Sequence, residues 1–300
     1  MKRIHLHPDG PEFSLLSAGF WRLNEWDMHT SDLIDFIEHC LELGITTFDH
    51  ADIYGDYGNE ALFGKALKER PDLRDKMELV TKCGICLTSS SRSEHTVQHY
   101  NTTATHIRAS VEQSLRNLET EVIDLILIHR PDPLMNAAEM AGIFSALLDE
   151  GKIRYVGVSN FTPSQFEMFQ SKLDVPLVTN QVECSLLHLN PIYDGTFDQA
   201  QQFGCSPMIW SPFAGGRFFS ENSERANRVR HSCNEMAIKY GVSIDQIALA
   251  WLLMLPCYPQ LVTGTGKKER ISGAAAALEL NMERQDWYKL LEASNGKPVP

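Results

Sequence analysis

Eight short apolar segments, each followed by a stretch with helical periodicity, constrain the fold of this chain more than any other feature. They are LLSAGF (15–20), ITTFD (45–49), MELVTK (77–82), VIDLILIH (122–129), IRYVGVS (153–159), LVTNQ (177–181), PMIWS (207–211) and QLVTG (260–264). Eight strands that alternate with helices predict a closed parallel (β/α)8 barrel, an α/β fold that takes about 250 residues. A doubly wound sheet would also alternate, but it would carry G-x-G-x-x-G after an early strand, and that motif is missing. The sequence therefore predicts a TIM barrel.

Capping signals support the helices between these segments. The stretch after 29 begins with the N-cap candidates Thr30 and Ser31, carries an apolar stripe at helical spacing, and ends at Gly44. The sequence TPSQ (162–165) is a capping box with proline at the first helical position. We expect a short N-terminal β-hairpin that closes the bottom of the barrel and an extra helix at the C-terminus. Because no Pro/Gly/Ser-rich linker divides the chain, residues 1–300 are predicted to form a single domain.

Charge and cysteine content indicate which cellular compartment and which kinds of binding partner suit this chain. The net charge of −12 argues against general binding to nucleic acid or to anionic membranes. The N-terminus lacks the apolar run of a signal peptide, and the longest apolar stretch stops at Pro256, too early to cross a bilayer. Seven cysteines, an odd number, suit a reducing compartment, and we read the C-x-x-C pair Cys83 and Cys86 as structural. We therefore expect a cytoplasmic protein with a small-molecule substrate and no obligate protein partner.

Polar side chains stand at the ends of the predicted strands, and the C-terminal ends of barrel strands face one shared cavity. Asp49 ends the second strand with Tyr54 just beyond it, Lys82 ends the third and His129 the fourth. A free tyrosine has a pKa of about 10, and a lysine ammonium beside the phenol would lower it. Each residue alone has an ordinary structural explanation, such as an N-cap, a loop aromatic or a core histidine. Together they predict a proton-transfer site. His50 and Asp52 alternate with them along an extended segment, so we assign these two structural roles.

The loops after the seventh and eighth strands resemble an anion site. Gly215-Gly216 and Gly264-Thr265-Gly266 allow backbone N–H groups to approach an anion closely. Lys267, Lys268 and Arg270 form a basic cluster where a helix begins, and positive charge is unfavourable there unless an anion compensates it. In barrel enzymes these two loops commonly hold phosphate.

Four segments, FDHADIYG, LVTKCGI, LILIHRPDP and GVSNF, resemble the signature segments of the aldo-keto reductases in their order and spacing. The resemblance covers essentially the whole chain and is strongest to a bacterial branch of that family. It implies a (β/α)8 barrel that transfers hydride reversibly between NAD(P)H and a carbonyl. It also implies that Tyr54 is the general acid, that Lys82 lowers its pKa, that Asp49 anchors the lysine, and that His129 orients the carbonyl.

The resemblance further implies a cofactor site and one wall of the substrate pocket. Ser159, Asn160 and Gln181 would hold the nicotinamide carboxamide, and Trp210 would stack on its ring. The remaining cofactor positions would be Gly19, Ser211, Phe213, Gly215, Arg217, Gly264, Thr265, Lys267 and Arg270, and Trp21 would line the substrate pocket. Several family members have lysine where Gly264 stands and Glu-Asn where Gly273-Ala274 stand. We expect NADPH because Lys267 and Arg270 remain, with NADH as the alternative.

Two other functions fit parts of the sequence. His5 and His7, with Asp49 and His129, suggest a metal-dependent barrel hydrolase, but another apolar segment separates this His-x-His from the first helix, so we expect it on the bottom hairpin. A cofactor-sensing regulatory subunit without turnover is the second alternative. The polar loop over residues 84–103 is a candidate lid.

Overall fold

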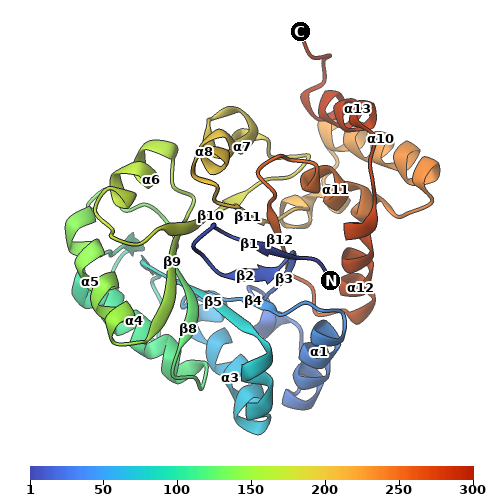
Figure 1. The fold of residues 1–300 in the computed structure, drawn as a ribbon. Helices are drawn as coiled ribbons and strands as arrows, with labels where there is room; N and C mark the ends of the chain where they lie inside the picture. The colour runs from blue at the N-terminus through green and yellow to red at the C-terminus, as the bar shows by residue number, and fades with distance from the viewer.

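The computed structural model describes residues 1–300 and confirms the predicted barrel (Figure 1). Eight parallel strands close it in chain order, and the last strand pairs with the first. The strands are β3 (Leu16–Gly19), β4 (Thr47–Asp49), β5 (Glu78–Cys83), β8 (Ile123–Ile128), β9 (Ile153–Ser159), β10 (Leu177–Glu183), β11 (Met208–Trp210) and β12 (Gln260–Thr263). Each one lies within or overlaps one of the eight apolar segments.

Helices surround the barrel (Figure 1). The outer ring comprises α1 (Thr30–Glu42), α3 (Asn59–Glu69), α4 (Ala104–Asn117), α5 (Ala137–Asp149), α6 (Pro163–Gln170), α8 (Thr196–Phe203), α11 (Ile244–Leu253) and α12 (Lys268–Ala276). Outside it, α10 (Glu224–Tyr240) packs against α13 (Arg284–Asn295), the expected C-terminal extra helix. Short helices are α2 (Tyr54–Tyr57), α7 (Asn190–Tyr193) and α9 (Arg217–Ser220), with 3-10 turns at Leu23–Glu25, Pro71–Lys76, Ala214–Gly216 and Ala277–Glu279. No single helix is long and apolar enough to cross a membrane, and α10 with α11 reaches that length only as a pair bent by 91°.

Local capping agrees with the sequence at one helix and differs at another. Thr162 caps α6, with Gln165 completing the capping box and Pro163 at the first helical position. The expected N-cap of α1 at Thr30 or Ser31 is wrong by one or two residues, because the cap is His29. The Asp32 carboxylate accepts a hydrogen bond of 3.1 Å from the His29 backbone N–H, which moves the start of the helix back.

The predicted hairpin closes the bottom of the barrel. The strands β1 (Arg3–His5) and β2 (Glu12–Ser14) pair in antiparallel fashion across the barrel end that faces the viewer in Figure 1. From this hairpin Leu6 and Phe13, at 0% and 1% exposure, pack against the interior residues Val80, Leu125 and Val178. The N-terminal ends of the strands are therefore sealed, and only the opposite end is available for a site.

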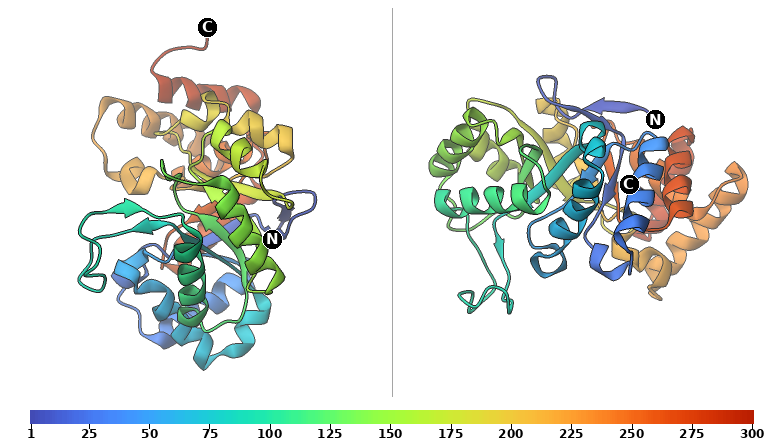
Figure 2. Two further views of the ribbon diagram at one scale, coloured as in Figure 1. Left: turned by 90° about the vertical axis from the view of Figure 1, so that its left-hand side faces the viewer. Right: turned by 90° about the horizontal axis from the view of Figure 1, so that it is seen from below.

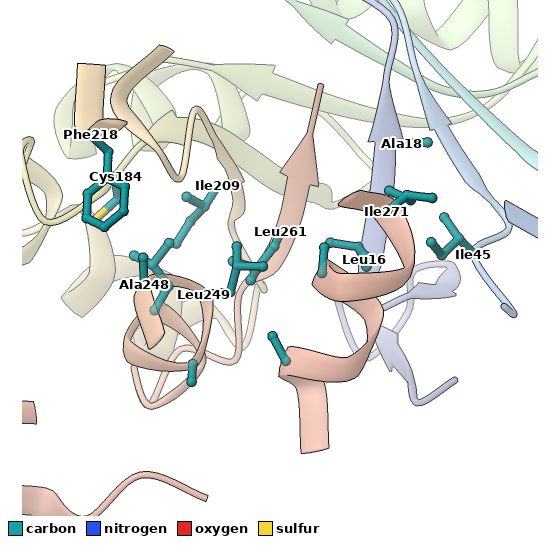
Figure 3. Packing of buried hydrophobic residues seen from close by; sticks show 14 of the residues in the cluster. Leu16, Ala18, Ile45, Cys184, Ile209, Phe218, Ala248, Leu249, Leu261 and Ile271 are labelled. Atoms are coloured by element: carbon teal, nitrogen blue, oxygen red, sulfur yellow. The ribbon is translucent and has the colours of Figure 1, made fainter. Parts of the chain in front are cut away.

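Outward-facing strand residues pack against the helices. Leu16 on β3 and Leu261 on β12 are fully buried in the largest apolar cluster with Ile271 of α12 (Figure 3). Leu249 of α11 lies in the same cluster (Figure 3). This layer fixes the strands, and with them the side chains at their C-terminal ends.

The segment predicted as a loop over 84–103 contains a second hairpin. The strands β6 (Ile85–Cys86) and β7 (His99–Tyr100) pair in antiparallel fashion, and the hairpin projects from the end of the barrel opposite β1 and β2 (Figure 2). Its base is attached to α2, because the Leu87 N–H donates a hydrogen bond of 2.7 Å to the Tyr57 hydroxyl.

Candidate active site

A cavity of about 790 Å³ opens at the C-terminal ends of the barrel strands. Most of the predicted site residues line it: Gly19, Trp21, Asp49, Tyr54, His129, Ser159, Asn160, Gln181, Trp210, Ser211, Phe213, Gly215, Gly264, Thr265 and Arg270. Three do not. Lys82 is only 1% exposed and lies behind Asp49 and Tyr54, while Arg217 and Lys267 lie outside the cavity lining.

A buried ion pair lies at the inner end of the cavity. The Lys82 Nζ donates to both Asp49 carboxylate oxygens, at 2.9 and 2.8 Å, and to the His50 carbonyl oxygen at 2.7 Å. Although burial alone would lower it, the attraction of Asp49 and Tyr54 raises the pKa of Lys82. The lysine therefore stays charged, and its position is fixed by three acceptors.

The Tyr54 phenol meets this ammonium from the cavity side. Its oxygen lies 3.4 Å from Lys82 Nζ. The chain reaches this position through an irregular turn in which Gly55 and Asp56 have φ of 59° and 55°. A Cβ at residue 55 would come within 1.9 Å of the Asn59 side-chain oxygen, so glycine is required there. Asn59 in turn donates to the carbonyl oxygen of Phe20, at 2.9 Å, and so joins the turn to the loop after β3.

The acidity of Tyr54 differs from the sequence-based expectation. We expected the ammonium of Lys82 to give a lowered pKa. Burial instead raises the pKa of the Tyr54 phenol, and the positive charge of Lys82, which lowers it, offsets only part of that effect. The predicted lowering by Lys82 is therefore present, but burial outweighs it and the pKa is raised overall. At neutral pH the phenol keeps its proton and is ready to donate it.

His129 completes the group on the other side of Tyr54. The two rings lie 5.8 Å apart between centroids at 78°, an edge-to-face arrangement. Burial and the nearby charge of Lys82 hold the pKa of His129 well below its usual range. The imidazole is therefore neutral, and its Nδ1 is buried without a hydrogen-bond partner. A neutral histidine at this place can donate one hydrogen bond to a bound oxygen.

Side chains from three neighbouring strands form a connected set along one wall. Trp210 Nε1 donates to the Asn160 side-chain oxygen at 3.1 Å, and Asn160 Nδ2 donates to Ser159 Oγ at 2.8 Å. Ser159 Oγ donates to the Gln181 carbonyl oxygen at 2.8 Å. The Gln181 side-chain amide donates to Asp49 at 2.7 Å, so in this structure it supports the ion pair. The wall thus presents amide and indole groups beside the phenol.

The far end of the cavity is rich in glycine and positive charge. Gly215 and Gly216 have φ of 67° and 99°, and a Cβ at either position would meet nothing within 4 Å. The space beside both positions is therefore open, while the Gly216 N–H donates to the Phe213 carbonyl oxygen at 2.9 Å. Arg270 lines this end and has no acidic partner in an ion pair. Arg217, in contrast, pairs with Glu221 at 3.3 Å.

Several lining residues were not singled out from the sequence: Arg22, Ile53, Ile85, Arg130, Phe219 and Asp245. Arg130 directly follows His129 at the end of β8, and Arg22 directly follows Trp21. Their positions at strand ends were a usable signal. Phe219 comes from α9 and Asp245 from the start of α11. Only the three-dimensional structure shows that these two residues line the cavity.

Groups outside the cavity keep structural roles. Cys83 and Cys86 are free and buried, and burial raises the pKa of the Cys86 thiol to about 11. His5 ends β1 on the bottom hairpin, at the end of the barrel opposite the cavity, as expected. No group of three or more His, Cys, Asp or Glu side chains is arranged to hold a metal ion.

Comparisons with known proteins agree with this geometry. The model of the Aldo/keto reductase family matches residues 15–295. The chain is 48% identical over 300 residues to oxidoreductase YdhF of Escherichia coli and 44% identical over 300 residues to a 6-dehydroglucose reductase of Agrobacterium fabrum, with 100% of each chain covered. Its fold superposes on the thermostable aldo-keto reductase Tm1743, solved with the inhibitor epalrestat, with a TM-score of 0.83 at 26% identity, covering 98% of this chain and 100% of the other.

Proposed function

Because this chain belongs to the aldo/keto reductase family and is an oxidoreductase, we propose that it uses NADPH to reduce small aldehydes and ketones to alcohols. The observation that carries the proposal is the Asp49–Lys82–Tyr54 relay beside a neutral His129 in the open cavity. This arrangement supplies a protonated, oriented acid at the place where a carbonyl oxygen would gain its proton.

Tyr54 acts as the general acid. The phenol is protonated at neutral pH, so its proton is available when negative charge develops on the carbonyl oxygen, and the charge of Lys82 offsets part of the burial effect that weakens it as an acid. Lys82, 3.4 Å away, stabilises the phenolate that forms once the proton has left. Asp49 keeps this ammonium in place and charged. The three groups therefore lower the barrier to proton transfer without a large change in geometry.

His129 positions the carbonyl. As a neutral imidazole it donates a hydrogen bond to the carbonyl oxygen and leaves the final proton transfer to Tyr54. Two donors that converge on one oxygen fix its direction and stabilise the charge that develops there.

The residues present fit a nicotinamide dinucleotide. The cavity runs from the catalytic group to the glycine-rich end with Arg270, and Trp210 offers an indole face between them. We assign Ser159, Asn160 and Trp210 to the nicotinamide, with the loop from Ser211 to Gly215 and the positions Gly264 and Thr265 beside the phosphates. Arg270, which is exposed and free of acidic partners, would bind a 2′-phosphate and favour NADPH. When bound, the reduced nicotinamide supplies the hydride to the carbonyl carbon.

The substrate pocket and the cellular setting follow from the same features. Trp21 and Phe219 are 53% and 50% exposed at the mouth, so a small carbon chain can pack against them. The name of the Agrobacterium fabrum relative supports a carbonyl substrate that carries further oxygen atoms. Seven free cysteines support a reducing, cytoplasmic setting.

The test compares the natural chain with Tyr54→Phe. Binding of NADPH and of NADH is titrated by quenching of tryptophan fluorescence, and reduction of a panel of aldehydes is followed by NADPH absorbance. We expect the variant to bind NADPH nearly normally and to lose at least a hundredfold in kcat. Tighter binding of NADPH than of NADH would support the role of Arg270.

Two outcomes contradict the proposal. Full activity of Tyr54→Phe would refute the assigned acid. Binding of NADPH by the natural chain without reduction of any carbonyl would favour the cofactor-sensing alternative, and absence of binding would refute the proposal as a whole.

A further inference from the structure

One positive charge beside the catalytic residues has no ion-pair partner in the protein. Arg130 follows His129 at the end of β8, is half-buried and lines the cavity. Its guanidinium lies over the Trp210 ring, 5.7 Å from the centroid, and no acidic side chain forms an ion pair with it. A half-buried guanidinium that faces a cavity and has no ion-pair partner is free to bind a carboxylate or phosphate on a ligand.

The other charged groups of the cavity either have a hydrogen-bond partner in the protein or lie at the glycine-rich end. Arg22 donates to the Gly215 carbonyl oxygen at 3.0 Å and lies over the Trp21 ring. Arg270 lies at the glycine-rich end, where Asp245 also lines the wall. Asp49, the carboxylate at the catalytic end, is already bound by Lys82 and Gln181. Arg130 is therefore the free cation of the catalytic end.

Arg130 is also close enough to the reacting groups to act on a bound substrate. Its charge contributes to lowering the pKa of both Tyr54 and His129, a smaller contribution than those of burial and Lys82. A carbonyl compound held by Tyr54 and His129 would share the cavity with Arg130, and with Trp21 and Phe219, which line it too.

We propose that Arg130 is a specificity-determining residue that binds a carboxylate or phosphate group on the tail of the carbonyl substrate. The inference rests on the proposed reductase function and narrows its substrate class to aldehydes and ketones that carry an anion. A guanidinium presents a planar fork of N–H donors that matches two oxygens of a carboxylate or phosphate. Cations around a cavity in a chain of net charge −12 also concentrate anions at its mouth.

The test uses matched substrate pairs. Succinic semialdehyde is compared with butanal, and glyceraldehyde 3-phosphate with glyceraldehyde, at saturating NADPH. A charge-assisted hydrogen-bonded pair is worth roughly tenfold to a hundredfold in kcat/KM. We expect the natural chain to prefer the anionic member of at least one pair by this factor, with the preference falling as salt is added. The pair that shows it identifies carboxylate or phosphate as the group bound.

Two variants and one control assign the preference to Arg130. Arg130→Gln should lose most of the anionic preference, mainly through KM, and Arg130→Lys should restore part of it because the charge returns without the planar fork. Lys172→Gln removes one positive charge from the exposed surface after α6, away from the lining of the cavity, and should keep the full preference. The dissociation constant for NADPH is measured for each variant.

The outcomes separate this inference from the proposed function. If the natural chain reduces the neutral aldehydes but shows no preference for either anion, the role of Arg130 is refuted and the reductase stands. A similar loss for Arg130→Gln on both members of a pair, or weakened NADPH binding, would assign the residue to the cofactor and also refute the inference. If no carbonyl is reduced at all, it is the proposed function that fails.

Discussion

The buried pair of Asp49 and Lys82 makes a quantitative prediction about stability. Their side chains are 4% and 1% exposed and are joined at 2.8 Å. Lys82→Met removes the ammonium and leaves the carboxylate buried, with the Gln181 amide as its remaining side-chain donor. Loss of one partner of a buried ion pair costs about 3–5 kcal/mol, because the remaining charge stays desolvated. Asp49→Asn should cost a similar amount, since it leaves the Lys82 ammonium buried without its carboxylate partner.

The double variant distinguishes this reasoning from a simple loss of contacts. Asp49→Asn with Lys82→Met removes both charges, so we expect it to recover to within about 1–2 kcal/mol of the natural chain. In thermal unfolding, each single variant should melt roughly 6–10 °C lower, at roughly 2 °C per kcal/mol for a chain of this size. The double variant should regain most of that loss.

Urea unfolding followed by circular dichroism and by tryptophan fluorescence would measure these free energies. Reductase activity is measured in parallel, and we expect all three variants to lack it because each alters the support of Tyr54. Single variants within about 1 kcal/mol of the natural chain would refute the reasoning. Additive losses in the double variant would also refute it, since they would show that the two charges do not depend on each other for stability.

Two further predictions concern other parts of the barrel. Gly64→Ala should destabilise the chain by more than about 2 kcal/mol, because its Cβ would lie 1.9 Å from the Asn117 carbonyl oxygen between α3 and α4. Gly142→Ala, on α5 with nothing within 4 Å, is the matched control and should stabilise by about 0.5–1 kcal/mol; similar melting temperatures for the two would contradict the packing argument. Burial and the charge of Lys82 lower the pKa of His50 to about 3, so below pH 6.5 the unfolded chain takes up a proton there that the folded chain does not. The natural chain should therefore lose about 1 kcal/mol more than His50→Leu between pH 7 and 5.5, and equal losses in urea unfolding would show that His50 titrates normally.

The sequence predicted the parts of the structure that depend on local pattern. The eight strands appear because each is a short apolar segment bounded by helix signals, and Asp49, Lys82 and His129 lie within one residue of the ends of three of them. The hydrophobic pattern does not single out Arg130, because polar residues commonly follow strands. Only the three-dimensional structure shows that no acidic side chain forms an ion pair with it.

Other features depend on opposing physical effects whose relative size cannot be judged from the sequence. The pKa of Tyr54 is set by burial against the charge of Lys82, and only the depth of the site decides which effect is larger. The N-cap at His29 depends on the reach of the Asp32 carboxylate. The hairpin of β6 and β7 lies within a polar stretch whose strands are only two residues each, too short to show alternation.

Closure of the barrel between its first and last strands has a consequence for synthesis of the chain. β3 pairs with β12, and beneath them the Gln260 side-chain amide donates to the Ser14 carbonyl oxygen, 246 residues earlier in the chain. During synthesis on the ribosome, one edge of β3 stays unpaired until β12 has emerged, which happens only when nearly the whole polypeptide has been made. An exposed strand edge favours pairing with other chains, and contacts at such long range form slowly. The nascent barrel therefore exposes this strand edge until synthesis is nearly complete, and truncation before β12 should yield aggregates rather than a smaller folded unit.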